Sequence, residues 1–306
     1  MDTFTDASYF DTIGGSPYMM GVSPWFYTNL PGFRKNWMWK GDDLWFDRWA
    51  NVIYLQPEYV QIITWNDYGE SHYIGPLRDK AYVAFDKGKA PFNFALGKKH
   101  DGWRAFLPYL IDYAKTGKAS FDKENAIAWY RPHPKGACGT GGTTGNTASQ
   151  LQDIYSPAEL VEDRVFYAAL LSSSATVSVS VGGKTIAGTW DYVPANGVGL
   201  YRGNVSFDGL TGPVAVTISR GGQILQASGD PITTSCEKDI ENWNPYVIQG
   251  TARSISPATP ISRGDAGCIR GFGAPKYQGL CEFTCKYGYC PKGSCTCTEL
   301  VSSPHF

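Results

Sequence analysis

Two apolar segments and an amphipathic segment between them open the chain. Residues 17–25 and 59–65 are apolar runs with the length of buried strands. Between them, one set of positions falls at the spacing of a helix face, with Asp42 and Asp43 suited to the helix N-terminus: Leu44, Trp45, Arg48, Trp49, Val52 and Ile53. A strand, a helix and a strand within about 50 residues predict a parallel βαβ unit.

The next periodic segment predicts a helix over residues 101–116. Asp101 is suited to its N-cap, Gly117 to its C-terminal stop, and Pro108 is expected to kink or split it. The apolar positions follow one helix face: Trp103, Phe106, Leu107, Leu110, Ile111 and Ala114. Residues 126–131 then have the pattern of a strand.

The composition changes at Gly136, where small and polar residues predict a linker over 136–160. Beyond it, residues 175–181 alternate strictly, and Gly182-Gly183 indicates a hairpin turn. Six or seven short strands predict a β-sandwich over 161–236, which we interpret as a stabilising accessory domain, with a carbohydrate-binding face as the alternative. A second linker is expected over 237–267.

The eight cysteines avoid the first 137 residues. Two bracket the predicted sandwich and are expected to pair, Cys138 with Cys236. The other six lie in a tail over 268–306, whose spacing favours three disulfides over a zinc site but does not define their connectivity: Cys268, Cys281, Cys285, Cys290, Cys295 and Cys297. Disulfides are typical of an oxidising compartment.

The N-terminal sequence conflicts with that compartment, because it has neither the basic nor the apolar region of a signal peptide. We expect that the chain lacks its true N-terminus and that the protein is secreted or wall-bound. Asn204 begins an Asn-Val-Ser sequon, which would be a glycosylation site in a secreted protein.

The composition is rich in aromatic residues, at 14%, and poor in charge, at 18%, in a chain of 306 residues with a net charge of −1. This balance suits an extracellular carbohydrate-handling protein. We expect no nucleic-acid partner, because no basic patch is present, and no membrane segment, because no apolar run reaches about 18 residues. We also expect a monomer without cofactor or metal.

Candidate chemistry follows the second apolar run directly. Residues 61–76 change from a strand to a polar loop that contains Asp67, Glu70 and His72. Two carboxylates flanking a bond are what glycoside hydrolysis needs, one as an acid and one as a base or nucleophile. The alternative is that Asp67 only forms a turn or caps a helix, which is the common use of an aspartate in such a loop.

Five stretches, in order, resemble glycoside hydrolase family 71, the fungal α-1,3-glucanases or mutanases: GVSPWFYTNL, NWMWKGDDLWFDRW, WNDYGESHYIGP, HDGWRAFLPYLIDYAKTG and AWYRPHPKGA. They cover most of the first 137 residues. The tail resembles the cysteine-rich C-terminal segment of some fungal glucanases.

The resemblance implies hydrolysis of α-1,3-glucan with inversion on a (β/α)8 barrel. It places the catalytic pair at Asp67 and Glu70, without saying which is the acid, and it implies that Asn66, Tyr68 and His72 orient substrate or tune the pair. His72 could instead be a packed core histidine. Trp25, Tyr27 and Trp65, at or beyond strand ends, are the candidates for stacking on sugar rings, whereas most tryptophans are expected in the core.

The chain departs from that family in its length. A barrel needs about 250 residues, but only residues 1–135 precede the first linker, so we expect the C-terminal part of a (β/α)8 barrel, low activity of the chain alone, and restored activity with the missing half. The alternative is a non-catalytic wall glycan-binding protein. A protease or esterase is disfavoured, because no G-x-S-x-G motif occurs.

Overall fold

A computed structural model describes residues 3–148, 151–194, 196–260, 267–286 and 294–301. Its first part contains α1 (Thr3–Ile13), β1 (Met19–Val22), α2 (Leu44–Leu55) and β4 (Tyr59–Ile62), and β1 pairs with β4 in parallel. The predicted βαβ unit is therefore present, with shorter strands than expected. Among the described residues these two strands form a sheet of their own, and no closed barrel is found.

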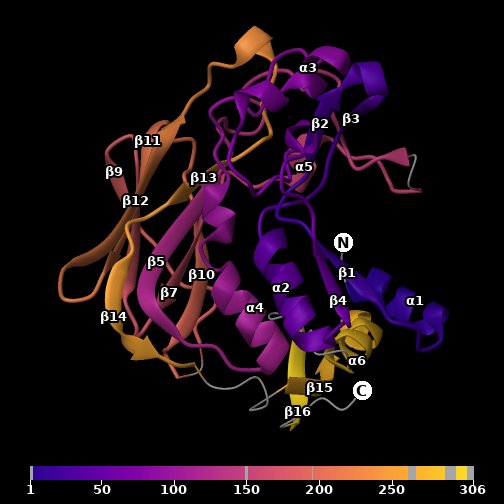
Figure 1. The fold of residues 1–306 in the computed structure, drawn as a ribbon, viewed down its shortest axis with the longest axis vertical. Helices are drawn as coiled ribbons and strands as arrows, with labels where there is room; N and C mark the ends of the chain where they lie inside the picture. The colour runs from indigo at the N-terminus through magenta and orange to yellow at the C-terminus, as the bar shows by residue number, and fades with distance from the viewer. Residues whose placement is uncertain (1–2, 149–150, 195, 261–266, 287–293, 302–306) are drawn as a thin grey trace.

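A hairpin interrupts this unit between β1 and α2. It consists of β2 (Tyr27–Leu30) and β3 (Lys35–Met38), joined by the 3-10 turn η1 (Pro31–Phe33). The hairpin and α3 (Val83–Lys87) lie at one end of the molecule (Figure 1), while α1 lies toward the other. Two further 3-10 turns flank this region, η2 (Tyr68–Glu70) and η3 (Asp79–Ala81).

The predicted helix over 101–116 is split, as Pro108 suggested. A 3-10 turn, η4 (Asp101–Arg104), precedes α4 (Leu107–Thr116), and Gly117 ends α4 in the left-handed conformation, at φ 71°. The proline lies in the first turn of α4, where its missing N–H costs no helical hydrogen bond. Asp101 is not a cap, since its carboxylate pairs with Arg104 inside η4.

The strand expected at the end of the barrel segment belongs instead to the sandwich. β5 (Phe121–Tyr130) pairs antiparallel with β7 (Arg164–Leu171) and β13 (Tyr246–Gln249), and the sheet continues with β10 (Gly199–Ser206) and β14 (Arg253–Ala258). The region 237–267, expected as a linker, thus supplies two strands of this sheet. The second sheet has the order β12-β11-β8-β9: Gln223–Ile232, Gly212–Ser219, Thr176–Val181 and Lys184–Ala187.

Burial explains why β5 joins that sheet. Successive side chains of a strand point to opposite faces, and in β5 both faces are covered. Trp129 and Ile127 face α2, η4 and α4 in one core, while Ala126, Ala128 and Tyr130 face the second sheet in another. The molecule is therefore built in three layers, with the five-stranded sheet in the middle (Figure 1).

The glycine-rich segment expected as a linker over 136–160 is docked against β3. It contains β6 (Thr144–Gly145), which pairs in parallel with β3, and the short helix α5 (Pro157–Leu160), which begins with a capping box. Asn36 of β3 donates to the Gly141 carbonyl and accepts from the Thr143 hydroxyl. The 3-10 turn η6 (Glu237–Asp239) lies beside this segment, because Gly139 bridges to Ile240.

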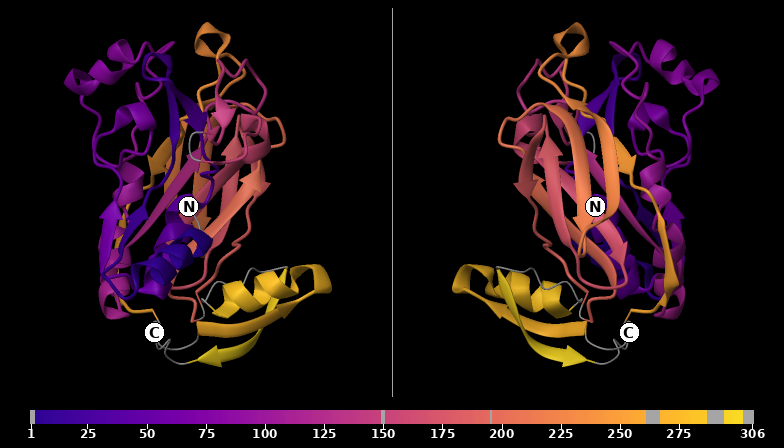
Figure 2. Two further views of the ribbon diagram at one scale, coloured as in Figure 1. Left: turned by 90° about the vertical axis from the view of Figure 1, so that its right-hand side faces the viewer. Right: turned by 90° about the vertical axis from the view of Figure 1, so that its left-hand side faces the viewer.

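A disulfide joins Cys138 to Cys236, with their Cα atoms 6.4 Å apart. In the tail, Cys281 pairs with Cys295, and Cys285 and Cys297 are also disulfide-bonded. Cys290 lies outside the described residues. The tail forms β15 (Gly267–Gly273), η8 (Pro275–Tyr277), α6 (Gln278–Lys286) and β16 (Cys295–Val301), and it lies below the sandwich as a separate small layer (Figure 2).

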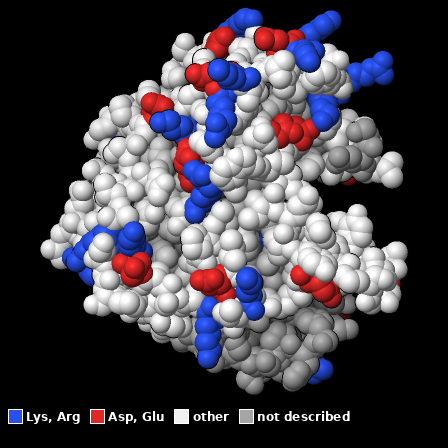
Figure 3. Space-filling view, in the orientation of Figure 1, with Lys and Arg blue, Asp and Glu red and all other residues white. Residues whose placement is uncertain are grey.

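Charges of both signs are mixed on the face shown in Figure 3, with broad uncharged areas between them. Among the described helices, none has the length and apolar character that crossing a membrane requires.

Candidate active site

The loop that follows β4 is closed by its own backbone. Thr64 donates its N–H to the His72 carbonyl at 3.0 Å and accepts from Ile74 at 2.9 Å, and Gly75 donates to Trp65 at 2.8 Å. Gly75 has no room for a side chain, because a Cβ there would lie 2.4 Å from the Trp65 carbonyl oxygen. The two ends of the loop are thus fixed side by side, and the residues between them project as one rigid turn.

Asp67 and Glu70 occupy that turn. Asp67 precedes the 3-10 turn η2, and its Oδ1 accepts the backbone N–H of Glu70 at 3.2 Å, so it does cap a helical turn. Its own N–H donates to the Thr64 hydroxyl at 3.0 Å. Gly69 packs closely against β2, since a Cβ added there would lie 3.0 Å from a methyl carbon of Leu30. The cap accounts for one oxygen of Asp67, and the residue remains exposed.

Glu70 is held from two sides. Its Oε1 lies 2.5 Å from the Lys35 ammonium nitrogen, and its Oε2 lies 2.9 Å from His72 Nε2. The other ring nitrogen of His72 lies 3.1 Å from the Thr64 hydroxyl, so the buried imidazole is fixed at both ends. These contacts orient the Glu70 carboxylate, which is 20% exposed.

The two carboxyl groups are shifted in opposite directions. The hydrogen bond with His72, and then the contact with Lys35, lower the pKa of Glu70 to about 2 against the effect of burial. Loss of solvation around its carboxyl, and then the charge of Glu70, raise the pKa of Asp67. Two carboxyl groups whose surroundings separate their pKa values are the usual basis of an acid and a base in one site.

Asp67, Glu70 and His72 also form a group of the kind that can hold a cation, because one ligand atom from each lies within 4.8 Å of the others. The contacts of Glu70 argue against this use. A lysine ammonium already takes one carboxylate oxygen and the histidine takes the other, and a bound cation would have to displace a positive charge.

The distance between the Asp67 and Glu70 carboxyl groups bears on the stereochemistry of hydrolysis. The nearest oxygens of the pair, within 4.8 Å of each other, are closer than the roughly 6.5–9.5 Å between carboxyl groups that leaves room for water in an inverting enzyme. Asp67 is the exposed member with few contacts, so it is the member that can move.

The other candidate residues separate into exposed and buried ones. Trp65 is 53% exposed, with the Arg104 guanidinium 5.3 Å from its ring, and Asn66 beside it is exposed as well. Tyr68 is buried, and its hydroxyl donates to the Pro76 carbonyl. His72 is buried, as a packed core histidine would be, but its ring also contacts the Glu70 carboxylate.

The expected stacking role of Trp25 and Tyr27 does not agree with their positions. Trp25 is buried, donates its indole N–H to the Trp243 carbonyl and lies against the Arg131 guanidinium. Tyr27 is fully buried, and its ring contacts Phe94. A ring enclosed by protein atoms has no face for a sugar, and here Trp243 and Gly41 lie against Trp25 while Phe94 lies against Tyr27.

Sequence reasoning missed Lys35 and the aromatic surroundings of His72. Phe26 lies 5.8 Å from the His72 ring and stacks on Trp37 and Trp39, which are half-buried. The alternation of Trp37 and Trp39 is a strand pattern that could have indicated β3. No local signal connects Lys35 with Glu70, because the contact spans 35 residues.

Asn204 lies in β10, with its side chain engaged on both sides. It accepts from Arg164 at 2.6 Å and donates to Asp191 at 2.7 Å. A glycan on its amide nitrogen would displace the contact with Asp191.

Comparison with known proteins shows what the chain is related to. The family model of glycosyl hydrolase family 71 matches residues 1–259. A mutanase of Penicillium rubens is 35% identical over 251 residues, which are 81% of this chain and 51% of that protein. A glucan endo-1,3-alpha-glucosidase of Schizosaccharomyces pombe is 34% identical over 235 residues, 76% of this chain and 50% of that protein.

A third relative is an ascus wall endo-1,3-alpha-glucanase of the same yeast, 33% identical over 195 residues, which are 62% of this chain and 41% of that protein. The chain thus spans about half the length of the curated relatives it matches. No solved structure matches it. From the family model and the first two relatives, the chain belongs to glycosyl hydrolase family 71.

Proposed function

We propose that this chain carries part of the hydrolytic site of an enzyme that cleaves α-1,3-glucosidic bonds of fungal wall glucan. The family membership supports the substrate class, because the two Schizosaccharomyces pombe relatives are named for action on 1,3-alpha-glucan. The observation that carries the assignment of the site is the placement of two neighbouring carboxyl groups in the turn after β4, with Glu70 held by Lys35 and His72. The opposite directions of the pKa shifts of Asp67 and Glu70 support it. β1 and β4 are, in this proposal, two neighbouring strands of the barrel.

The opposite shifts divide the two catalytic roles. Asp67, which retains its proton to a higher pH, is the general acid that protonates the leaving oxygen of the glucosidic bond. Glu70, ionised by its contacts with His72 and Lys35, is the base that takes a proton from the attacking water. His72 positions Glu70, while Trp65 and Asn66 offer an exposed ring and an amide for the sugar.

Inversion by this pair sets a condition on geometry. Water must enter between the acid and the base, so the Asp67 side chain has to rotate away from Glu70 when a glucan chain binds. Rotation costs Asp67 only its cap to the Glu70 N–H, whereas Glu70 stays fixed. The product released first is then the β-anomer.

The remaining parts of the proposal concern the surroundings of the enzyme. The Cys138–Cys236 and Cys281–Cys295 disulfides favour a secreted or wall-bound protein. Its partner is the α-1,3-glucan polysaccharide, and the protein acts as a monomer. A non-catalytic glycan-binding protein is the competing function, and it needs neither carboxyl group for its activity.

The test is the release of reducing sugar from insoluble α-1,3-glucan by the 306-residue chain and by its Asp67→Asn and Glu70→Gln variants. Release is expected to be slow in the chain, and each substitution is expected to reduce it by on the order of 100-fold or more, with glucan binding retained. Asp86→Asn, on the nearby helix α3, is the matched control and should match the unaltered chain.

Two results would contradict the proposal. Equal release by the unaltered chain and both variants would place the reaction elsewhere. Binding of glucan without any release, even by the unaltered chain, would favour the glycan-binding function.

A further inference from the structure

We infer that Lys35 is a positioning residue of the hydrolytic site, whose ammonium group fixes the orientation and the charge of Glu70. The inference rests on the proposed role of Glu70 as the base. Lys35 lies outside the five stretches that resemble the family and is not one of the candidate residues drawn from the sequence. It is the residue that follows the tip of the β2–β3 hairpin.

The hairpin places Lys35 by its backbone. Lys35 is the first residue of β3 and pairs with Leu30, the last residue of β2. Arg34 adopts the left-handed conformation, at φ 56°, which ends η1 and turns the chain into β3. Leu30 in turn packs against Gly69 of η2, so the strand pair that carries Lys35 is also the one that contacts the turn carrying Glu70.

A docked segment holds the hairpin from its other edge. β6 pairs with β3, and Asn36, next to Lys35, is bound by Gly141 and Thr143. The Cys138–Cys236 disulfide anchors the same segment. The lysine therefore extends from a strand that is fixed on both sides, and its approach to Glu70 follows from the fold and not from a mobile surface side chain alone.

The contact divides the carboxylate between two partners. Lys35 Nζ lies 2.5 Å from Oε1, and His72 Nε2 lies 2.9 Å from Oε2. One partner alone would leave the carboxylate free to turn about its last bond, whereas two partners on different oxygens fix its plane. The lone pairs left on the oxygens then point in defined directions, as a base requires.

Among the described residues around Glu70, Lys35 is the cation in direct contact with its carboxylate, next to the His72 imidazole. β2 presents the apolar Leu30 and α3 presents Ala84 to η2, and Asp67, the neighbouring carboxyl group, is the member of the pair that retains its proton to a higher pH. The lysine side chain is 42% exposed, so solvent weakens its effect on Glu70. Its removal should therefore shift the ionisation of Glu70 moderately and should hardly change stability.

Two substitutions and one control test this. Lys35→Met keeps the unbranched side chain, one atom shorter and without its charge, and Lys35→Arg keeps the charge. Lys87→Met is the control, because it removes the same charge from α3, which lies against η2. Lys87 itself makes no described contact with Glu70. The readout is the titration of the Glu70 carboxyl carbon by NMR in the 306-residue chain, with backbone spectra showing that each variant is folded.

As the pH of the unaltered chain is lowered, Glu70 should remain ionised below the pH of about 4.3 at which exposed glutamates take up their protons. Lys35→Met should move its titration upward by about one pH unit, within the range that one opposite charge typically produces. Lys35→Arg and Lys87→Met should leave it close to the unaltered value. In a parallel assay of glucan hydrolysis, the pH at which the rate falls in acid should be higher in Lys35→Met than in the unaltered chain, and unchanged in the other two variants.

The outcomes separate this inference from the proposed function. An unchanged Glu70 titration in folded Lys35→Met would overturn the role of Lys35, whatever the enzyme does. If the Glu70 titration shifts in Lys35→Met but Glu70→Gln hydrolyses glucan at the full rate, Lys35 does affect Glu70 but the proposed function is contradicted. The same result would overturn the role of Lys35 as a positioning residue in catalysis.

Discussion

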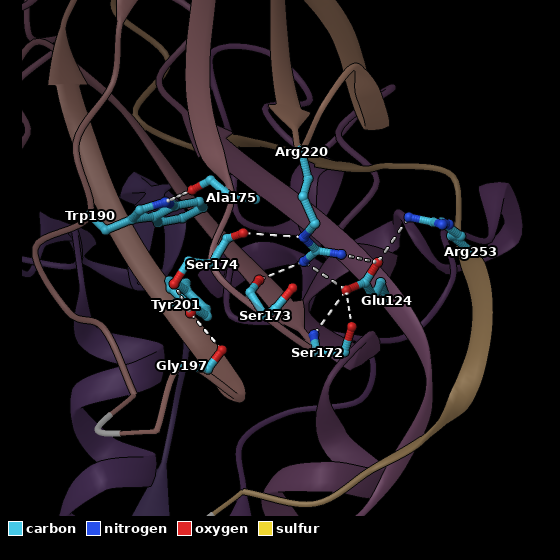
Figure 4. A network of polar contacts seen from close by, with 10 residues as sticks. All are labelled: Glu124, Ser172, Ser173, Ser174, Ala175, Trp190, Gly197, Tyr201, Arg220 and Arg253. Carbon is cyan, nitrogen blue, oxygen red and sulfur yellow. Dashed lines mark hydrogen bonds and ion pairs between the residues drawn. The ribbon is translucent and has the colours of Figure 1, made fainter.

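Glu124 and Glu70 are both bound by cationic side chains and shielded from solvent, and of these two it is Glu70 that has a second carboxylate beside it. Glu124, at the start of β5, is fully buried. Figure 4 shows it bonded to the guanidinium of Arg220, with Oε1 and Nη2 at 3.0 Å, and close to Arg253. Ser172 donates both its N–H and its hydroxyl to the same oxygen. Glu70 has two partners, is 20% exposed and borders Asp67.

The difference shows how to separate carboxylates that stabilise the fold from carboxylates that can take part in a reaction. Burial favours the neutral form of Glu124, but Arg220 and Ser172 outweigh it and lower the pKa of this carboxyl. Ser172 directly follows β7, Arg220 directly follows β11 and Arg253 begins β14, so the contacts of Glu124 join the two sheets. The contacts of Glu70 leave one side open next to a carboxyl group with a raised pKa. A paired glutamate indicates function only where such an open side remains.

Removing the buried pair should give the largest change in stability. Glu124→Gln leaves Arg220 without its counter-charge, and we expect a loss of about 2–3 kcal/mol in the free energy of unfolding, less than for a fully buried pair because Arg220 is partly exposed. Chemical denaturation at neutral pH measures it. Glu70→Gln should change the same quantity by less than about 1 kcal/mol. Equal losses in both variants would break the comparison.

The pH dependence follows from the sign of the shift. The pKa of Glu124 is lower in the folded state, so its contribution is present above the ordinary pKa and is lost as the pH falls. The difference between the unaltered chain and Glu124→Gln should therefore shrink in acid.

Glu241, which is buried like Glu124, provides the opposite case and a smaller effect. Glu241 accepts the Gly136 N–H at 3.2 and 3.3 Å, with no ion pair among the described residues, and lies in the field of Asp163 and Arg131. Burial raises its pKa to about 7. Its contribution is present below the ordinary pKa and is lost as the pH rises through about 7.

Glu241→Gln keeps an acceptor for Gly136 without the charge. We expect the variant to be more stable than the unaltered chain by roughly 1–2 kcal/mol at about pH 8, with no gain at about pH 4. Denaturation at the two pH values measures this. A gain that does not depend on pH would show that packing, and not ionisation, separates the two side chains.

Sequence reasoning reached those parts of the fold that are local. β1, α2 and β4 follow one another along the chain, and the alternation of Val177, Val179 and Val181 marks a strand with one buried face. The partners of β5 could not be read in this way, because β7 and β13 lie about 40 and 120 residues beyond it, and a strand pattern does not name its neighbours.

The site shows the same division. Asp67, Glu70 and His72 are within six residues of one another, and a single turn brings them together. Lys35 approaches Glu70 only because β2 and β3 form a hairpin, and Trp25 is enclosed by Trp243, more than 200 residues away. The glycine-rich segment after Gly136 was expected as a linker from its composition, but its docking depends on the edge of β3.

The pH dependence of glucan hydrolysis tests the central claim most directly, since it reports the ionisation of the acid and the base together. With Glu70 as the base and Asp67 as the acid, release of reducing sugar should persist in acid down toward the pKa of Glu70, about 2, to the extent that the chain stays folded. It should decline on the alkaline side as Asp67, with its raised pKa, loses its proton. Hydrolysis that instead increases from acid to neutral pH and stays constant above it would contradict the account, because that profile belongs to a base that is protonated in acid and to a site that needs no proton donor.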